Sequence, residues 1–257
     1  MQKDVYSLRD KVALITGGSR GIGQAIAMLF AEAGADVVIA SRNRRPRELE
    51  ETAERVRSMG RKVLAVPAHV AKKEDVNRLV QSSLDAFGRI DILVNNAGGN
   101  PVLSTIADLD DEAFDKVLEI NLKAAFLMSK AAIPAMIRQG GGRIINISSV
   151  SGLRARNDKT GAYCISKAAL NMMTQVMARE LAPYHILVNA IAPGSIQTEF
   201  SRVNWENKDR RTKRISEIEL KRFGNPEEVA GLALCLASAA GSFITGEIIR
   251  VDGGEMI

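Results

Sequence analysis

Val12-Ala13-Leu14-Ile15-Thr16-Gly17-Gly18-Ser19-Arg20-Gly21-Ile22-Gly23, near the start of this 257-residue chain, is the stretch that decides its fold. An apolar run is followed by a glycine-rich turn and then by an amphipathic segment, which predicts a strand, a turn and a helix. Glycines in such a turn let the main chain approach a phosphate group at the positive N-terminus of the helix. The stretch therefore predicts the phosphate-binding turn of a dinucleotide site.

The same alternation of short apolar runs and longer amphipathic segments continues along the chain. We predict strands at 12–16, 37–40, 63–66, 90–95, 143–147, 187–190 and 248–251. We predict helices at 22–32, 47–59, 73–87, 112–138, 161–181 and 226–236. This order is typical of an α/β protein: a single-domain, Rossmann-like, doubly wound fold with a mostly parallel, seven-stranded sheet and helices on both faces. One domain, 1–257, accounts for the whole length.

A second short motif, Tyr163-Cys164-Ile165-Ser166-Lys167, lies in one of the predicted helices. Residues four apart are neighbours on one helix face, so the tyrosine and the lysine are expected to lie side by side. A free tyrosine has a pKa of about 10, and a fixed cation nearby favours its phenolate form. The pair therefore predicts a tyrosine that exchanges a proton with a ligand. We expect that ligand at the carboxyl ends of the strands, where a parallel sheet binds its ligands.

Composition and charge argue against several other classes of protein. The formal net charge is +5, but basic residues are not interleaved with aromatic ones, so we expect a solvated basic surface and no nucleic-acid partner. The two cysteines, Cys164 and Cys235, have no disulfide or metal-ligand pattern, so we expect no metal site. Residues 1–11 lack the apolar core of a signal peptide, and we expect no segment to span a membrane. These features predict a cytoplasmic protein.

The chain resembles the short-chain dehydrogenase/reductase family from Lys11 to Gly254. The resemblance rests on motifs in the family's order: Thr16-Gly17…Gly21-Ile22-Gly23, Asn95-Asn96-Ala97-Gly98, Asn121-Leu122, Ile147-Ser148-Ser149, Tyr163…Lys167, Pro193-Gly194 and Val251-Asp252-Gly253-Gly254. Their joint occurrence is far more specific than any one of them. The resemblance implies an oxidoreductase that interconverts a ketone and a secondary alcohol by hydride transfer with a nicotinamide cofactor.

The resemblance also implies a catalytic set made up of Asn121, Ser149, Tyr163 and Lys167. Tyr163 would be the general acid and base, and Ser149 would hydrogen-bond the substrate oxygen. Lys167 would hold the nicotinamide ribose and favour the phenolate, while Asn121 would order a water molecule. Ser149 lies one residue farther from Tyr163 than is usual in the family, and alternation along the loop makes Ser151 the alternative.

The end of the second predicted strand, Ser41-Arg42-Asn43, indicates which nicotinamide cofactor binds. A site for NAD has an acidic residue there to bind the ribose hydroxyls, and this segment has none. Arg42 suits a 2′-phosphate through its planar, permanently charged guanidinium, and Arg20 could approach from the glycine turn. We therefore predict NADP, with Ser41, Arg42 and Asn43 in contact with it. The alternative is that Arg42 belongs to a solvated basic run with Arg44, Arg45 and Arg47.

The resemblance implies further residues at the cofactor: Gly17, Ser19, Arg20, Gly21, Ile22, Gly23, His69, Val70, Asn95, Ala97, Gly98, Tyr163, Lys167, Pro193, Gly194, Ile196 and Thr198. Ile196 would lie against the nicotinamide and Thr198 near its carboxamide. His69 takes the place of the aspartate that the family usually has beside the adenine ring. A histidine can hydrogen-bond or stack there, or can have an unrelated surface role.

A substrate lid is expected at about 195–222, where the family has a segment that folds over the substrate. Residues 199–222 contain eight basic and five acidic side chains, and Arg154, Arg156 and Lys159 add charge in a neighbouring loop. Facing the cleft, these charges could steer an anionic substrate; the alternative is that most of them are solvated.

Two alternative functions stay open at this point. One is a 3-oxoacyl-thioester reductase acting on acyl carrier protein or coenzyme A thioesters, although Pro183-Tyr184-His185 stands where carrier-protein reductases often have an arginine. The other is a catalytically idle NADP-binding protein that acts through association.

A homotetramer or dimer is expected, because family members commonly associate through the helices that correspond to 112–138 and 161–181. The second of these helices carries more apolar residues than one core-facing stripe requires. Full burial inside the monomer would explain the same pattern.

Overall fold

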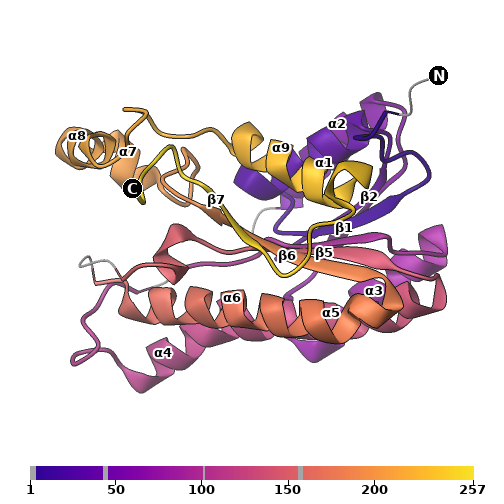
Figure 1. Ribbon diagram of the computed structural model, residues 1–257, viewed down its shortest axis with the longest axis horizontal. Coiled ribbons are helices and arrows are strands. Elements are labelled where there is room, and N and C mark those ends of the chain that lie inside the picture. Colours follow the sequence, from indigo (N-terminus) through magenta and orange to yellow (C-terminus); the bar gives the residue numbers. More distant parts are fainter. Residues whose placement is uncertain (1–3, 43–45, 101, 156–158) are drawn as a thin grey trace.

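Residues 4–42, 46–100, 102–155 and 159–257 are described by the computed structural model. Seven parallel strands form one sheet in the order β3-β2-β1-β4-β5-β6-β7 (Figure 1). The strands are β1 (Val12–Thr16), β2 (Asp36–Ser41), β3 (Val63–Pro67), β4 (Ile92–Asn95), β5 (Gly142–Ile147), β6 (Ile186–Pro193) and β7 (Ile248–Val251). The predicted seven-stranded parallel sheet is confirmed.

Helices cover both faces of the sheet, as the doubly wound prediction requires. One face carries α1 (Gly21–Glu32), α2 (Pro46–Ser58) and α9 (Pro226–Ala237) (Figure 1). The other carries α3 (Lys73–Phe87), α4 (Asp111–Leu118), α5 (Ala124–Arg138) and α6 (Gly161–Leu181). Successive residues of β1 point to opposite faces, so Ile15 packs in one core and Leu14 in the other. These two apolar cores hold the sheet between its helix layers.

The helix predicted at 112–138 is a continuous helical run with one irregular turn. α4 leads into a π-helical turn, Glu119–Lys123, and then into α5. By length and composition alone, the run Asp111–Arg138 could cross a membrane, which corrects our expectation that no segment could. Its apolar character has a structural cause, because α5 buries Met128 and Met136 in the core beneath the sheet.

The strand order reverses between β1 and β4, and such a reversal defines the ligand crevice of a doubly wound sheet. The turns that follow β1, β4, β5 and β6 all lie at this carboxyl edge. The segment between β6 and α9 extends from the same edge and contains two short helices that we did not predict, α7 (Arg202–Glu206) and α8 (Lys208–Ser216) (Figure 1). The sheet thus gathers the predicted site residues and the lid at one edge.

Candidate active site

The glycine turn after β1 has the backbone that a phosphate-binding turn needs. Gly17 and Gly21 have φ angles of +68° and +55°, which glycine adopts without strain. A Cβ atom on Gly23 would lie 2.3 Å from the main-chain oxygen of Gly17, so no larger residue fits there. Within the described chain, no side chain caps the N-terminus of α1 and its first turn has no acidic residue. The first amide groups of α1 are therefore open to an anion.

The remaining predicted residues of this turn differ in exposure. Ser19 is buried, and its main-chain oxygen accepts a hydrogen bond from Thr52 Oγ1 of α2 at 3.4 Å. Arg20 is exposed at the N-cap of α1, and Ile22 is half-buried. Arg20 is thus the residue of the turn whose charged side chain lies in solvent.

Thr16 joins the glycine turn to the turn after β4. Its Oγ1 atom accepts hydrogen bonds from the N–H groups of Asn96 and Ala97, each at 3.0 Å, and donates one to the oxygen of Val94 at 3.2 Å. The side-chain Nδ2 of Asn96 donates to the main-chain oxygens of Thr16 and Gly17 at 2.9 and 3.1 Å. Sequence reasoning gave Thr16 and Asn96 no role of their own. A hydroxyl that ends a buried strand beside a glycine turn was the available signal.

Asn95 was predicted to contact the cofactor, but its side chain points into the core. The Nδ2 atom donates to Ser129 Oγ at 3.0 Å and to Asn146 Oδ1 at 2.9 Å, and Asn146 continues to Thr174 at 2.9 Å. All four residues are buried. This polar chain ties β4 and β5 to α5 and α6, so the side chain of Asn95 has a structural role in the core.

The side chain of Ser149 lies beside Tyr163 and acts to lower the pKa of the tyrosine. Its Oγ atom also accepts a hydrogen bond from the N–H of Ser151 at 3.1 Å, which holds the loop after β5 in position. Ser148 points away, because its buried hydroxyl donates to Asn171 Oδ1 at 2.6 Å. The structure therefore pairs Tyr163 with Ser149, while Ser151 supports that serine through its backbone.

Lys167 is buried on α6, four residues after Tyr163. Its Nζ atom donates to the main-chain oxygen of Ile147 at 2.8 Å and lies 5.7 Å from the centre of the Tyr163 ring. A Cβ atom on Gly98 would lie 3.5 Å from this Nζ and 2.9 Å from Asn121 Oδ1. Gly98, Asn121 and Lys167 therefore converge beside the tyrosine.

The pKa of Tyr163 departs from our expectation. We expected the neighbouring lysine to lower it, but burial raises the pKa of Tyr163 to about 12, while the neighbouring Ser149 side chain acts in the opposite direction. Burial also lowers the pKa of Lys167 to about 8. The cause is the same for both groups, because a poorly solvated site disfavours the charged form of each.

Asn121 lies in the π-helical turn and is buried. Its Oδ1 accepts a hydrogen bond from the N–H of Gly99 at 2.9 Å, and its Nδ2 donates to the oxygen of Gly99 at 2.7 Å. Both ends of the amide are thus committed to the loop after β4. A π-helical turn also shifts the main-chain hydrogen-bond pattern, which often occurs at functional sites. The amide of Asn121 is therefore engaged with the loop, and its ordering of a water beside Lys167 stays a prediction.

The residues predicted for the adenosine half lie around the ends of β2 and β3. Ser41 ends β2, and Arg42 is exposed directly after it. Burial lowers the pKa of His69, and the positive charges of Arg42 and Lys116 lower it further, which places both charges near the ring. His69 Nδ1 accepts a hydrogen bond from the N–H of Ala71 at 3.3 Å. Val70 packs against the core beneath the sheet, and Asn43 lies outside the described residues.

The segment after β6 faces the glycine turn. Pro193 ends β6, and the N–H of Gly194 donates to the oxygen of Val251 at 3.0 Å. Ile196 is buried, and a Cβ atom on Gly21 would lie 3.4 Å from Thr198 Cγ2. The lid therefore begins directly opposite the turn that is open to a phosphate.

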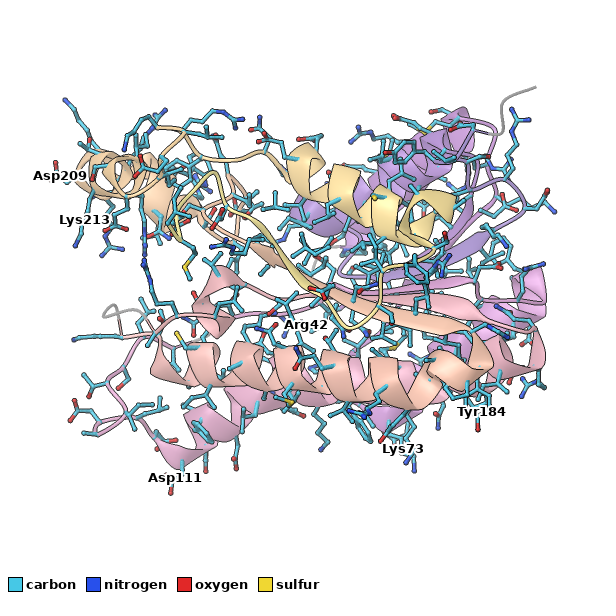
Figure 2. The ribbon with its side chains drawn as sticks, in the orientation of Figure 1. Arg42, Lys73, Asp111, Tyr184, Asp209 and Lys213 are labelled. Carbon is cyan, nitrogen blue, oxygen red and sulfur yellow. The ribbon has the colours of Figure 1, made fainter. Side chains whose placement is uncertain are left out.

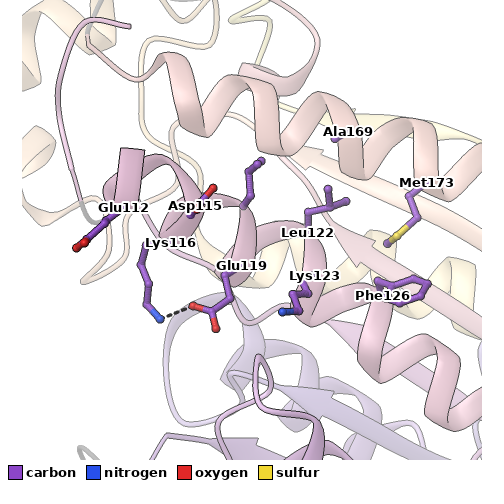
Figure 3. A pocket seen from close by; sticks show the side chains of 10 residues that line it. Glu112, Asp115, Lys116, Glu119, Leu122, Lys123, Phe126, Ala169 and Met173 are labelled. Atoms are coloured by element: carbon purple, nitrogen blue, oxygen red, sulfur yellow. Dashed lines mark hydrogen bonds and ion pairs between the residues drawn. The ribbon is translucent and has the colours of Figure 1, made fainter. Parts of the chain in front are cut away.

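A hollow of about 820 Å³ is lined by residues of the α4–α5 run and of α6 (Figure 3). Glu119 and Lys116 form an ion pair at its rim, and Phe126 and Met173 supply apolar lining. None of the predicted catalytic residues lines it. Among the described residues, no three His, Cys, Asp or Glu side chains form a group that could hold a metal ion.

Comparison with known proteins agrees with this geometry. A family model described as Enoyl-(Acyl carrier protein) reductase matches residues 17–255. Dehydrogenase/reductase SDR family member 4 of Sus scrofa is 42% identical over 247 residues, which are 96% of this chain and 88% of that protein.

Two solved structures are similar over nearly the whole chain. RhlG of Pseudomonas aeruginosa, in an active-site complex with NADP, is 36% identical with a TM-score of 0.92 over 98% of this chain and 99% of that chain. A 7α-hydroxysteroid dehydrogenase with NADH and 7-oxo glycochenodeoxycholic acid is 32% identical with a TM-score of 0.93 over 99% and 97%. This chain therefore belongs to the short-chain dehydrogenase/reductase family, a family of oxidoreductases that use nicotinamide cofactors.

Proposed function

We propose that this chain is an NADP(H)-dependent oxidoreductase that interconverts a ketone and a secondary alcohol by hydride transfer. The observation that carries the proposal is the position of Tyr163, which lies beside the side chain of Ser149 with its ring centre 5.7 Å from the Nζ atom of Lys167. It brings two hydroxyl groups together beyond the end of β5, beside the crevice of the sheet. Two hydroxyls at one point suit a single carbonyl oxygen, which accepts two hydrogen bonds.

The residues that line the crevice fit a dinucleotide. The uncapped N-terminus of α1 suits a pyrophosphate, and the close approach of Thr198 to Gly21 brings the lid to the same turn. Arg42, directly after β2, suits a 2′-phosphate. A site for NAD has an acidic residue at this strand end to bind a free ribose hydroxyl, and neither Ser41 nor Arg42 is acidic. The choice of NADP is also supported by the similar protein RhlG, whose structure was solved in a complex with NADP.

The chemistry divides between cofactor and chain. When bound, the cofactor supplies a hydride to the carbonyl carbon or accepts one from the alcohol carbon. Tyr163 donates its phenol proton to the carbonyl oxygen as the C–H bond forms, and Ser149 donates a hydrogen bond to the same oxygen. Lys167 stabilises the phenolate that remains through its nearby charge. In alcohol oxidation, the Tyr163 phenolate takes the proton back.

A turnover screen tests this proposal. Purified protein is incubated with NADPH, and in parallel with NADH, against ketones, 3-oxoacyl thioesters and oxo acids, while absorbance of the reduced cofactor is followed. We expect reduction of a ketone with a preference for NADPH. A preference for NADH would overturn the cofactor assignment. Binding of NADPH without turnover on any carbonyl would favour the catalytically idle alternative.

We further propose that the protein is cytoplasmic and forms a homotetramer or dimer through the outer faces of α5 and α6. Four large apolar side chains on these helices, Phe126, Ile165, Met172 and Val176, are each 45% to 59% exposed. Exposed apolar side chains gathered on one face are typical of an interface. Light scattering should give a multiple of the 27.8 kDa chain mass. The paired substitution Met172→Glu and Val176→Glu should yield monomers.

A further inference from the structure

The lid places an aromatic ring beside the tyrosine of the candidate active site. The ring centres of Phe200 and Tyr163 are 6.4 Å apart, with an angle of 37° between their planes. This geometry is within the range of favourable aromatic pairs. Phe200 nevertheless leaves 59% of its surface exposed. A large apolar surface next to the reacting group is therefore open to whatever enters the cleft.

Hydrogen bonds within the lid fix the position of Phe200. Ser201 Oγ donates to the main-chain oxygen of Ile196 at 2.5 Å, and the N–H of Thr198 donates to the same Oγ at 3.1 Å. Trp205 Nε1 donates to the oxygen of Thr198 at 2.8 Å. The residues on both sides of Phe200 are thus tied together by side chains. Its main chain is held in place before any ligand arrives, which reduces the ordering cost of a contact with that ligand.

The charges that flank Phe200 pair with one another. Arg202 contacts Glu206 at 2.6 Å and Glu199 at 3.5 Å. Elsewhere in the lid, Arg222 forms two hydrogen bonds with Glu228, at 2.7 and 2.8 Å. α8 carries further charged residues, but Asp209 and Lys213 lie at the outer end of the lid in Figure 2. Arg202 and Arg222, two of the basic residues that were candidates for an anionic substrate, are therefore engaged with carboxylates, and Lys213 lies at the outer end of the lid.

A second apolar element lies near the start of the helix that carries Tyr163. The loop after β4 pairs with the segment before α6 through a bridge between Ser104 and Thr160. A Cβ atom on Gly161 would lie 2.8 Å from Cδ1 of Ile106 in this loop. Ile106 is 58% exposed. Apolar surface thus approaches α6 from the loop after β4 as well as from the lid.

We infer that Phe200 is a specificity-determining residue of the proposed ketone reductase, and that it selects substrates whose carbonyl group carries an aryl or bulky apolar substituent. This inference rests on the proposed function. The substituent packs on the exposed surface of Phe200 while the carbonyl oxygen meets Tyr163 and Ser149. Burial of apolar surface favours binding, and an aromatic substituent adds the preference for tilted ring pairs.

The test compares three ketones of graded size with two variants. Phenyl methyl ketone, cyclohexyl methyl ketone and 2-butanone are reduced by wild type, Phe200→Ala and Phe200→Leu at saturating NADPH. We expect Phe200→Ala to lower kcat/KM about tenfold or more for the two bulky ketones, mainly by raising KM, and less than about twofold for 2-butanone. Phe200→Leu should retain part of the lost activity. Phe243→Ala is the matched control, because Phe243 is fully exposed and precedes β7 at the opposite edge of the sheet.

A binding measurement separates this inference from the proposed function. Calorimetry measures the affinity of phenyl methyl ketone for the NADPH complexes of Tyr163→Phe and of Tyr163→Phe combined with Phe200→Ala. Weaker binding by the double variant supports the role of Phe200 even if no ketone is turned over, in which case only the proposed reaction fails. Equal losses of kcat/KM on all three ketones, or no change in either measurement, would overturn the role of Phe200. A wild-type preference for 2-butanone over both bulky ketones would overturn the substrate class.

Discussion

The Nζ atom of Lys167 is hydrogen-bonded to the main-chain oxygen of Ile147, at 2.8 Å, rather than to the phenol of Tyr163. It lies 5.7 Å from the centre of the tyrosine ring, and the lysine is only 4% exposed. The end of β5 therefore fixes the position of the cation, and the lysine acts on Tyr163 through space. Because burial lowers the pKa of Lys167 to about 8, this charge is lost as the pH rises through that value.

The two directions of the reaction should depend on pH in opposite ways. Reduction needs the phenol form of Tyr163, and burial raises the pKa of this group to about 12, so the phenol is present throughout the neutral range. Oxidation needs the phenolate, whose share grows as the pH rises. We expect kcat/KM for reduction to be flat or falling from about pH 6 to about pH 9, and kcat/KM for oxidation to rise over the same range. Initial rates at saturating cofactor in a constant ionic-strength buffer measure both. A reduction rate that climbs with pH would mean that the proton donor is a different group.

Arg42→Ala should weaken NADPH much more than NADH, because only NADPH carries the 2′-phosphate. A charge-assisted hydrogen bond contributes about 1.5 to 3 kcal/mol, so we expect at least a tenfold loss of NADPH affinity, which corresponds to about 1.4 kcal/mol. Fluorescence titration with each cofactor measures the ratio. Arg47→Ala is the matched control, since Arg47 is exposed in the same basic stretch at the start of α2. Equal weakening of NADPH and NADH by Arg42→Ala would assign Arg42 to the solvated surface.

Asn121→Ala should destabilise the loop after β4 as well as impair turnover. The substitution removes both hydrogen bonds to Gly99 and leaves a main-chain N–H and a main-chain oxygen without their partner. We expect the free energy of unfolding in urea to fall by about 2 kcal/mol. Asn77→Ala on the exposed side of α3 should change it by less than about 0.5 kcal/mol. Unchanged stability together with lost activity would mean that the amide of Asn121 acts on the reaction directly.

The elements of the sheet could be predicted because each carries a repeated local signal. β1 ends where the apolar run meets Gly17, and α3 was predicted with its observed bounds, Lys73–Phe87. The helices of the lid gave no such signal, because α7 has five residues and α8 buries none of its side chains. Hydrophobic periodicity cannot reveal a helix that has no buried face.

Side-chain direction was the part of the site that sequence patterns could not supply. Asn95 and Asn96 form one motif in the sequence, but alternation along the strand points their side chains in different directions. The side chain of Asn95 lies in the core, and that of Asn96 contacts the glycine turn. The raised pKa of Tyr163 depends on burial by residues from distant segments, which the spacing of Tyr163 and Lys167 does not report. Phe200 lies beside Tyr163 because of the path of the lid, which only the tertiary structure determines.

The substitution Tyr163→Phe tests the central claim, that Tyr163 exchanges the proton during hydride transfer. It removes one hydroxyl group and little volume, so the fold and the affinity for NADPH should be kept. We expect kcat on the best ketone to fall at least about a hundredfold, because general acid catalysis contributes about 10² to 10⁴ in rate. Stopped-flow measurement of a single turnover from the preformed NADPH complex reports this step directly. A variant that binds NADPH normally and keeps more than about a tenth of the wild-type rate, a loss of under about 1.4 kcal/mol, would show that Tyr163 is not the general acid.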